Sequence, residues 1–276
     1  MCSIRKRTIS RFLLAIVVAT LLSSVPTFAL ADEITVAAAA DLTFAFKDVA
    51  AKFHQQSGDT AKLSFGSSGN FFSQIQNGAP FDLFFSADIG YAKKLESAGL
   101  IEPGTLYEYA IGKIVLWVPN ASTLDVSKGL AVLNDPSIKK IAIANPEHAP
   151  YGRAAMAAMK HDGIYDGVKD KIVLGENISQ TAQFVQSGNA DIGIVALSLA
   201  ISPTMKDTGK YFEIPSADYP PIEQAAVVVK SSKKKPLAQK FLSFLRTPEI
   251  VALMERYGFT VPKPTDSASA PAPANQ

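Results

Sequence analysis

Short strand-like runs that alternate with helical patterns limit this chain to few folds. Runs of Val, Ile, Leu, Ala and Phe, bounded by Gly, Pro, Asn or Asp, recur between residues 33 and 230, and segments with helical spacing follow most of them. In the first such segment, one face of the predicted helix carries Leu42, Phe46, Val49, Ala50 and Phe53, and Gly58 ends the helix. Strands and helices that alternate in this way form parallel sheets with helices packed on them. The sequence therefore predicts an α/β protein.

The predicted strands cover residues 33–40, 62–66, 82–87, 113–119, 140–145, 171–175, 191–196 and 223–230, and predicted helices include 70–77, 90–100, 235–245 and 247–258. Two β-rich stretches, around 108–119 and 219–230, have the positions of strands that cross between two lobes. We therefore expect a first lobe of residues 32–112 plus 224–262 and a second lobe of residues 113–223. Each lobe is expected to be a mainly parallel sheet flanked by helices.

Residues 1–31 have the pattern of a secretory signal peptide. Four basic residues and no acidic one lie within residues 1–11, an apolar run follows at 12–22, and a small-x-small cleavage site ends at Ala31. The apolar run is short for a membrane span, so we expect export and cleavage rather than anchoring. The single cysteine, Cys2, would leave with this segment, so no disulfide is expected in the mature chain. The Pro-, Ala- and Ser-rich tail at 263–276 is expected to be disordered.

The charge balance gives no reason to expect nucleic acid or an anionic membrane as a partner. The precursor has a formal net charge of +2, but residues 1–31 hold four of its 27 Lys and Arg and none of its 25 Asp and Glu. Cleavage after Ala31 therefore leaves a net charge of −2. Proteins that bind phosphate backbones or acidic lipids carry an excess of positive charge, which this chain does not have.

Four strand-to-helix junctions carry the residues that could bind a ligand. They are residues 40–42, 66–70, 150–152 and 177–179, and they contain Asp41, Ser68, Tyr151 and Ile178. Ligands of open α/β sheets bind at the carboxyl ends of strands, and helix N-termini offer unpaired N–H groups and partial positive charge. If the four junctions meet, they form a small-anion site without lysine or arginine. Taken singly, Ser68, Asp41 and Asn177 could each be plain helix N-caps, and Tyr151 a packing residue.

Other chemistries find little support in the residues. The GSSG segment at 66–69 is one residue short of the G-x-S-x-G elbow of serine hydrolases, and none of His54, His148 and His161 has a motif context. The sequence shows no metal-ligand spacing, phosphate-binding loop or dinucleotide fingerprint. A secreted hydrolase that uses Ser67 or Ser68 is the alternative from another class, although the sequence identifies no base for such a nucleophile.

Several segments resemble the periplasmic molybdate-binding proteins of bacterial molybdate ABC transporters. They are AAAADLTFAFKDVAAKF, SFGSSGNFFSQIQNGAPFDLFFSAD, NPEHAPYGRAA, SGNADIGIVA and RYGF, and the resemblance covers residues 33–262. The combination of GAPFDLFFSAD with PEHAPYG is the specific part. The resemblance implies a two-lobed periplasmic binding-protein fold of type II, which closes over one tetrahedral dianion and delivers it to an inner-membrane permease.

The resemblance also implies which residues bind the dianion. Ser68 matches a serine of the family, and Tyr151 and Ile178 match positions that offer backbone donors. Asp41 stands where relatives usually have a serine, and Ala196 where they often have a tyrosine. We expect the Asp41 backbone N–H to donate while its carboxylate turns away to cap its own helix, because a carboxylate beside a dianion is repelled. The phenol of Tyr151 is expected to replace the missing tyrosine hydroxyl.

The implied ligand is molybdate or tungstate, bound as an oxyanion with no direct contact between protein and metal. The implied protein is a periplasmic monomer with no enzymatic activity and no cofactor. Sulfate or another small oxyanion is the nearest alternative, since selection between such ions rests on pocket size. A chelated ferric ion would require paired tyrosines and carboxylates, and Tyr151 is the single tyrosine at the four junctions.

Overall fold

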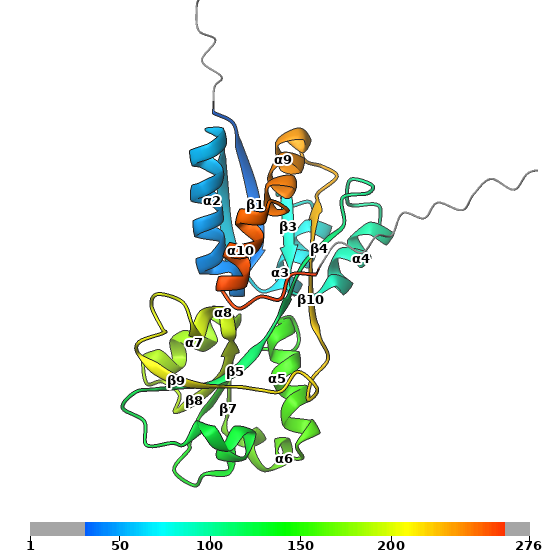
Figure 1. Ribbon diagram of the computed structural model, residues 1–276. Coiled ribbons are helices and arrows are strands. Elements are labelled where there is room, and N and C mark those ends of the chain that lie inside the picture. Colours follow the sequence, from blue (N-terminus) through cyan, green and yellow to red (C-terminus); the bar gives the residue numbers. More distant parts are fainter. Residues whose placement is uncertain (1–30, 263–276) are drawn as a thin grey trace, which may run out of the picture. The chain divides into compact units, whose positions relative to one another are not determined.

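Two five-stranded sheets, each flanked by helices, form the part of the chain that the computed structural model describes, residues 31–262 (Figure 1). In each sheet four strands run in one direction, and one reversed strand lies second from an edge. The predicted α/β class with two mainly parallel sheets is confirmed. The predicted disordered tail, and the predicted signal peptide except for its last residue, lie outside the described residues.

The first sheet has the strand order β2-β1-β3-β10-β4. Its strands are β1 (Glu33–Ala39), β2 (Thr60–Gly66), β3 (Leu83–Ser86), β4 (Tyr107–Gly112) and β10 (Ile222–Val228). The helices of this lobe are η1 (Ala40–Leu42), α2 (Thr43–Ser57), α3 (Ser68–Gln76), α4 (Ile89–Ser97), α9 (Lys235–Leu245) and α10 (Pro248–Arg256). As predicted, Gly58 ends α2, with a left-handed φ of 76° that favours glycine at this position.

The second sheet repeats this arrangement with the order β7-β6-β8-β5-β9. Its strands are β5 (Ile114–Pro119), β6 (Ile141–Ala144), β7 (Ile172–Gly175), β8 (Ile192–Ala196) and β9 (Gly209–Glu213). The helices of this lobe are η2 (Val126–Asn134), α5 (Pro150–His161), α6 (Tyr165–Val168), η3 (Lys169–Lys171), α7 (Ile178–Gln186) and α8 (Leu197–Ala200).

The chain passes between the two sheets at two places. β4 and β5 belong to different sheets although Lys113 alone separates them, and the chain returns between β9 and β10. Each of the two predicted crossing stretches thus lies at a change of sheet. The residue boundaries of the lobes stay a prediction.

Aromatic packing holds the helices of the first lobe against its sheet. Phe46 and Phe53, on the predicted apolar face of α2, are fully buried. The Phe46 ring meets Phe85 of β3 edge to face at 4.8 Å between centroids, and the Phe53 ring meets Phe241 of α9 in the same way at 5.0 Å. Such pairs contribute about 0.5–1.5 kcal/mol beyond the burial of their area. They fix α2 and therefore the position of η1 at its start.

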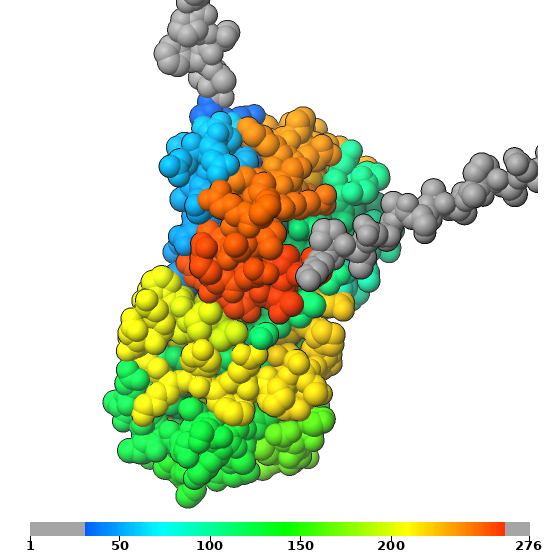
Figure 2. Space-filling model, viewed as in Figure 1, coloured from blue at the N-terminus to red at the C-terminus, as the bar shows by residue number. Residues whose placement is uncertain are grey.

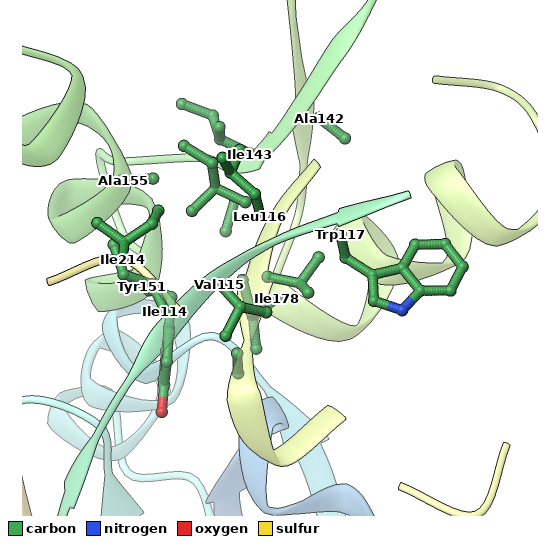
Figure 3. Close-up of a cluster of buried hydrophobic side chains, with 14 of the residues drawn as sticks. Ile114, Val115, Leu116, Trp117, Ala142, Ile143, Tyr151, Ala155, Ile178 and Ile214 are labelled. Carbon is green, nitrogen blue, oxygen red and sulfur yellow. The ribbon is translucent and has the colours of Figure 1, made fainter. Parts of the chain in front are cut away.

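The second lobe packs around β5, whose residues Ile114–Val118 are all buried (Figure 3). A strand covered on both faces has a continuous apolar sequence rather than an alternating one, which explains the run IVLWV. Tyr151 and Ile178 belong to the same cluster. The first turns of α5 and α7 are therefore anchored in the core of this lobe.

The two lobes also touch away from the crossing strands. In Figure 2 the yellow residues near 200 lie against the red residues that follow α10. A Cβ atom added at Gly258 would come within 2.8 Å of the Leu197 side chain. Within residues 31–262, no helix has the length and apolar character needed to cross a membrane.

Candidate functional site

The starts of four helices meet at one small cavity of about 10 Å³. It is lined by Ala39, Ala40, Asp41, Gly66, Ser67, Ser68, Ala87, Ala149, Pro150, Tyr151, Asn177 and Ile178. Apart from Ala87, which follows β3, these residues come from the starts of η1, α3, α5 and α7, which follow the parallel strands β1, β2, β6 and β7. The four junctions thus meet at one cavity, which the sequence had left open. It stays a prediction that a ligand is bound by Asp41, Ser68, Tyr151 and Ile178.

At the start of α3 the two neighbouring serines, Ser67 and Ser68, accept hydrogen bonds from different backbone N–H groups. Ser67 is the N-cap, and its Oγ accepts a hydrogen bond from the Asn70 N–H at 3.4 Å. Ser68 is fully buried, and its Oγ accepts from the Ala87 N–H at 2.9 Å. No acceptor for the Ser68 hydroxyl hydrogen is found in the described part of the chain. Ser68 is thus a donor held in place at the cavity, and the plain-cap interpretation applies to Ser67 instead.

The first turns of α5 and α7 bring backbone donors to the cavity. Asn177 is the N-cap of α7, as the sequence allowed, and accepts from the N–H groups of Ser179 and Gln180 at 3.0 and 3.1 Å. The N–H groups of Tyr151 and Ile178 have no hydrogen-bond acceptor among residues 31–262. Such free N–H groups carry the partial positive charge of a helix N-terminus. They can therefore donate to an anion in the cavity.

The Asp41 carboxylate is buried and bound by protein groups. Asp41 is 1% exposed, and its Oδ2 accepts from the Tyr151 hydroxyl at 2.9 Å and from the Gln224 amide at 2.8 Å. The prediction that this carboxylate caps its own helix is wrong, because η1 begins after Ala39 without a side-chain cap. The reason is that Gln224 and Tyr151 offer two donors from other elements, and the sequence does not show that these lie beside Asp41.

Burial changes the protonation of Asp41. It raises the pKa of this carboxyl from 3.8 to about 6, although the hydrogen bonds from Gln224 and Tyr151, and the polar backbone N–H groups of Asp41 and Leu42 nearby, lower the pKa. Among residues 31–262 no lysine or arginine lines the cavity, so none of their positive side chains favours the charged form there. The site therefore contains a carboxyl group that gains a proton more readily than an exposed aspartate.

The Tyr151 hydroxyl is occupied by protein partners. It donates to Asp41 Oδ2 and accepts from the Gln224 amide at 3.0 Å, and Gln224 Oε1 in turn accepts from the Tyr109 hydroxyl at 2.6 Å. In Figure 3 the ring leaves the apolar cluster with its oxygen toward the first lobe. A hydroxyl has one hydrogen to donate, and this one goes to Asp41. The structure thus does not support the expectation that this phenol replaces the hydroxyl missing at Ala196.

Gln224, Tyr109 and Gly112 complete this buried network, and none of them was expected from the sequence. A Cβ atom at residue 112 would lie 2.2 Å from the Tyr151 hydroxyl, so glycine is required there by close approach. Gln224 is the one residue of these three with a sequence signal, because an amide inside the apolar strand EQAAVVVK needs a buried partner. The partner itself could not be named without the fold.

Hydrogen bonds between the lobes surround the cavity. The Gly69 N–H donates to the His148 carbonyl at 2.9 Å. The hydroxyls of Ser179 and Ser198 donate to the backbone carbonyls of Ala40 and Asp41, each at 2.8 Å. Farther out, Arg153 of α5 pairs with Asp88 at 2.6 Å. These contacts describe a conformation in which the two lobes are closed on each other.

The three histidines lie in different settings. His54 is exposed, and His161 lies on the surface beside Asp162 and Asp218. His148 lies next to the cavity, where its Nδ1 is 2.9 Å from Ser67 Oγ. The structure thus supplies the neighbouring base that the sequence could not identify for Ser67.

Comparison with known proteins places the chain among bacterial transport proteins. Residues 34–260 match the family model described as bacterial extracellular solute-binding protein. The chain is 39% identical over 231 residues to molybdate-binding protein ModA of Rhodobacter capsulatus, a match that covers 84% of this chain and 89% of the relative. It is 40% identical over 229 residues to ModA of Azotobacter vinelandii, covering 83% of this chain and 90% of that protein.

A solved structure shows the same similarity in three dimensions. The periplasmic molybdate-binding protein of Azotobacter vinelandii matches with a TM-score of 0.79 at 36% sequence identity. The match covers 83% of this chain and all of that one. The similarity therefore includes both lobes and the cavity between them.

Proposed function

Because the chain belongs to the bacterial extracellular solute-binding proteins, we propose that it captures molybdate, or the similar tungstate dianion, between its two lobes. The ligand would then pass to an ABC permease. The observation that carries this proposal is the meeting of four helix starts at a small cavity without lysine or arginine. The two ModA relatives at 39% and 40% identity support molybdate as the ligand.

The donor set suits a fully deprotonated oxyanion. Such an ion has acceptor oxygens alone, and the cavity offers the Ser68 hydroxyl and the N–H groups of Tyr151 and Ile178. The helix N-termini add partial positive charge without the mobility of a long cationic side chain. Asp41 completes the proposed ligand-binding set. In this proposal the protein contacts the oxygens and never the metal.

Closure of the two lobes is the proposed binding motion. The proposed lobes are residues 32–112 plus 224–262 and residues 113–223, joined by the chain at β4–β5 and before β10. Ser68 comes from the first lobe, while Tyr151 and Ile178 come from the second. A ligand that binds both sets of donors stabilises the closed arrangement over the open one.

The cellular setting follows from the family and the predicted signal peptide. We propose that the protein is exported, that cleavage follows Ala31, and that the mature monomer works in the periplasm. The relatives named above are binding proteins, and we propose neither an enzymatic activity nor a cofactor for this chain. N-terminal sequencing of periplasmic protein tests this processing, and a sequence that begins before Thr27 would contradict it.

Native mass spectrometry and thermal unfolding test the ligand directly. Molybdate and tungstate should each add one oxyanion per chain and raise the melting temperature. At a thousandfold excess over the dissociation constant, the stabilisation is about 4 kcal/mol. Chloride should have no effect, and sulfate at the same concentration should have a smaller one. An equal effect of sulfate would contradict the proposed specificity, and no effect of molybdate would contradict the proposed function.

The contact between Ser67 and His148 favours a second candidate function, a secreted serine hydrolase. The Glu176 carboxylate lies 3.7 Å from His148 Nε2, so an acid contacts a histidine that in turn contacts a serine, as in a serine hydrolase. However, Ser67 Oγ already caps α3, and the pair joins residues of different lobes. We therefore propose that it stabilises closure. A serine-directed phosphonate should leave the mass of the protein unchanged, whereas a label on Ser67 would favour the hydrolase.

A further inference from the structure

We propose that Asp41 contacts the bound oxyanion as a neutral carboxylic acid, with the proton on Oδ1, so that binding of a dianion takes up one proton. This inference rests on the proposed function of the same cavity. It adds a specificity-determining proton to a site that otherwise uses hydroxyl and backbone donors.

The geometry of the carboxyl group is the first support. Oδ2 accepts two hydrogen bonds, from Tyr151 and Gln224, whereas Oδ1 is buried without any partner. Among the described residues, Asp41 Oδ1 and Trp117 Nε1 are the two buried side-chain polar atoms that have no hydrogen-bond partner. An unpaired buried carboxylate oxygen is unfavourable, so such an atom calls for an explanation. Asp41 lines the oxyanion cavity, and a ligand oxygen there can serve as its partner.

The charges at the cavity decide which partner holds the proton. A carboxylate oxygen and an oxyanion oxygen are both acceptors, so they repel each other unless one of them carries a proton. The described part of the chain brings no lysine or arginine to the cavity that could compensate the repulsion. A proton on Oδ1 removes the charge of Asp41 and turns the atom into a donor. The carboxyl then acts on the dianion as Ser68 does.

The surroundings of Asp41 make its carboxyl easier to protonate than an exposed aspartate even before a ligand arrives. Burial raises its pKa to about 6, and a dianion beside it raises the pKa further. The ionisable groups in contact with its carboxyl or beside that contact are Tyr151 on α5 and Tyr109 on β4, and burial also raises their pKa values. The helices α7 and α8 carry no ionisable residue. The other ionisable residues of the elements around Asp41 do not line the cavity; they are Lys47, Asp48, Lys52 and His54 of α2, Lys62 of β2, Tyr107 and Glu108 of β4, Arg153, Lys160 and His161 of α5, and Glu223 of β10.

The direction of the pH effect follows from these pKa values. In the free protein Asp41 loses its proton as the pH rises through about 6, and in the complex it loses the proton at a higher pH. Between these two pKa values the complex holds one proton more than the free protein, and buffer supplies it. Molybdate affinity should therefore fall about tenfold per pH unit in this range.

Isothermal titration calorimetry counts the proton. Molybdate is titrated into the wild-type protein at about pH 7.5 in Tris and in HEPES, whose ionisation enthalpies differ, and the difference in binding heat gives the protons exchanged. We expect an uptake of about one proton per molybdate. Asp41→Asn presents an amide donor that does not titrate, so it should bind with no uptake and with an affinity independent of pH. Circular dichroism checks that this variant is folded.

His148 is the control for a proton taken up elsewhere. His148→Gln should retain the uptake, and its loss in this variant would assign the proton to the histidine and overturn the inference. Molybdate binding by the wild-type protein without a buffer-dependent heat would also overturn it, while the proposed function would stand. An absence of molybdate binding would instead contradict the proposed function itself.

Discussion

Substituting Gly69 by alanine should weaken oxyanion binding without unfolding the protein. Gly69 lies in the first turn of α3, and its N–H donates to the His148 carbonyl of the other lobe at 2.9 Å. A Cβ atom at residue 69 would lie 2.8 Å from each of three atoms, which are His148 Cβ, the His148 carbonyl oxygen and the Tyr91 hydroxyl oxygen. Real Cβ atoms do not approach backbone so closely, so the two lobes must separate.

The Gly69→Ala substitution should destabilise the closed state of the protein. Overpacking of a tight contact costs about 1–3 kcal/mol, and loss of the hydrogen bond to His148 costs about 0.5–1.5 kcal/mol. If closure is required for binding, the affinity for molybdate should fall roughly tenfold to a thousandfold, at about 1.4 kcal/mol per decade. The ligand-free protein can open and relieve the contact. Its melting temperature should not fall, since alanine is the better helix former by about 1 kcal/mol.

Calorimetric titration with molybdate and a thermal scan without ligand measure the two effects separately. Gly167→Ala is the matched control, because Gly167 lies in the short helix α6 and its added Cβ would meet no atom closer than 3.8 Å. The control should keep the parental affinity. A Gly69→Ala affinity within a factor of two of the parent would show that binding does not require this closed contact.

Four further substitutions test the site. Ser68→Ala removes one hydrogen bond to a charged acceptor, which contributes about 1.5–3 kcal/mol, so calorimetry should show molybdate binding at least tenfold weaker. Ser67→Ala should weaken binding less. Equal losses of affinity in the two variants would contradict the different roles of the two serines. Tyr151→Phe should lower the molybdate affinity less than Ser68→Ala does, because the Tyr151 hydroxyl donates its hydrogen bond to Asp41. An equal loss of affinity would show that this hydroxyl donates to the ligand instead. The raised pKa of Asp41, about 6 instead of 3.8, means that its charged form destabilises the folded state by up to about 3 kcal/mol. Asp41→Asn removes this charge, so it should raise the free energy of unfolding at about pH 7.5 by up to that amount. That gain should disappear below about pH 4, where the carboxyl is protonated in both states, and urea unfolding that shows no gain at about pH 7.5 would contradict the burial argument.

Much of the fold could be predicted because its signals are local. The apolar face of α2, the end of that helix at Gly58 and the buried run of β5 all follow from the spacing of residues. The ends of the parallel strands also indicated which junctions could form a site. The direction of the strands within each sheet depends on long-range pairing, so β5 and β10 could not be recognised from the sequence as the reversed strands.

The details of the site could not be predicted, because they depend on which residues of distant segments meet. Ser67 and Ser68 are equally good caps by sequence, and the Ala87 N–H is what distinguishes Ser68. The Asp41 carboxylate turns to Tyr151 and Gln224, which are 110 and 183 residues away in the chain. No local rule connects such positions. The buried network was therefore missed, while the helix starts around it were found.

A crystal structure of the protein with molybdate, from diffraction data collected at the molybdenum absorption edge, would locate the bound ion. We expect one strong anomalous peak in the cavity, between Ser68 on one side and the N–H groups of Tyr151 and Ile178 on the other. Each of these donors should lie within hydrogen-bond distance of an oxygen of the ion. A peak elsewhere on the protein, with this cavity empty, would contradict the proposed binding site.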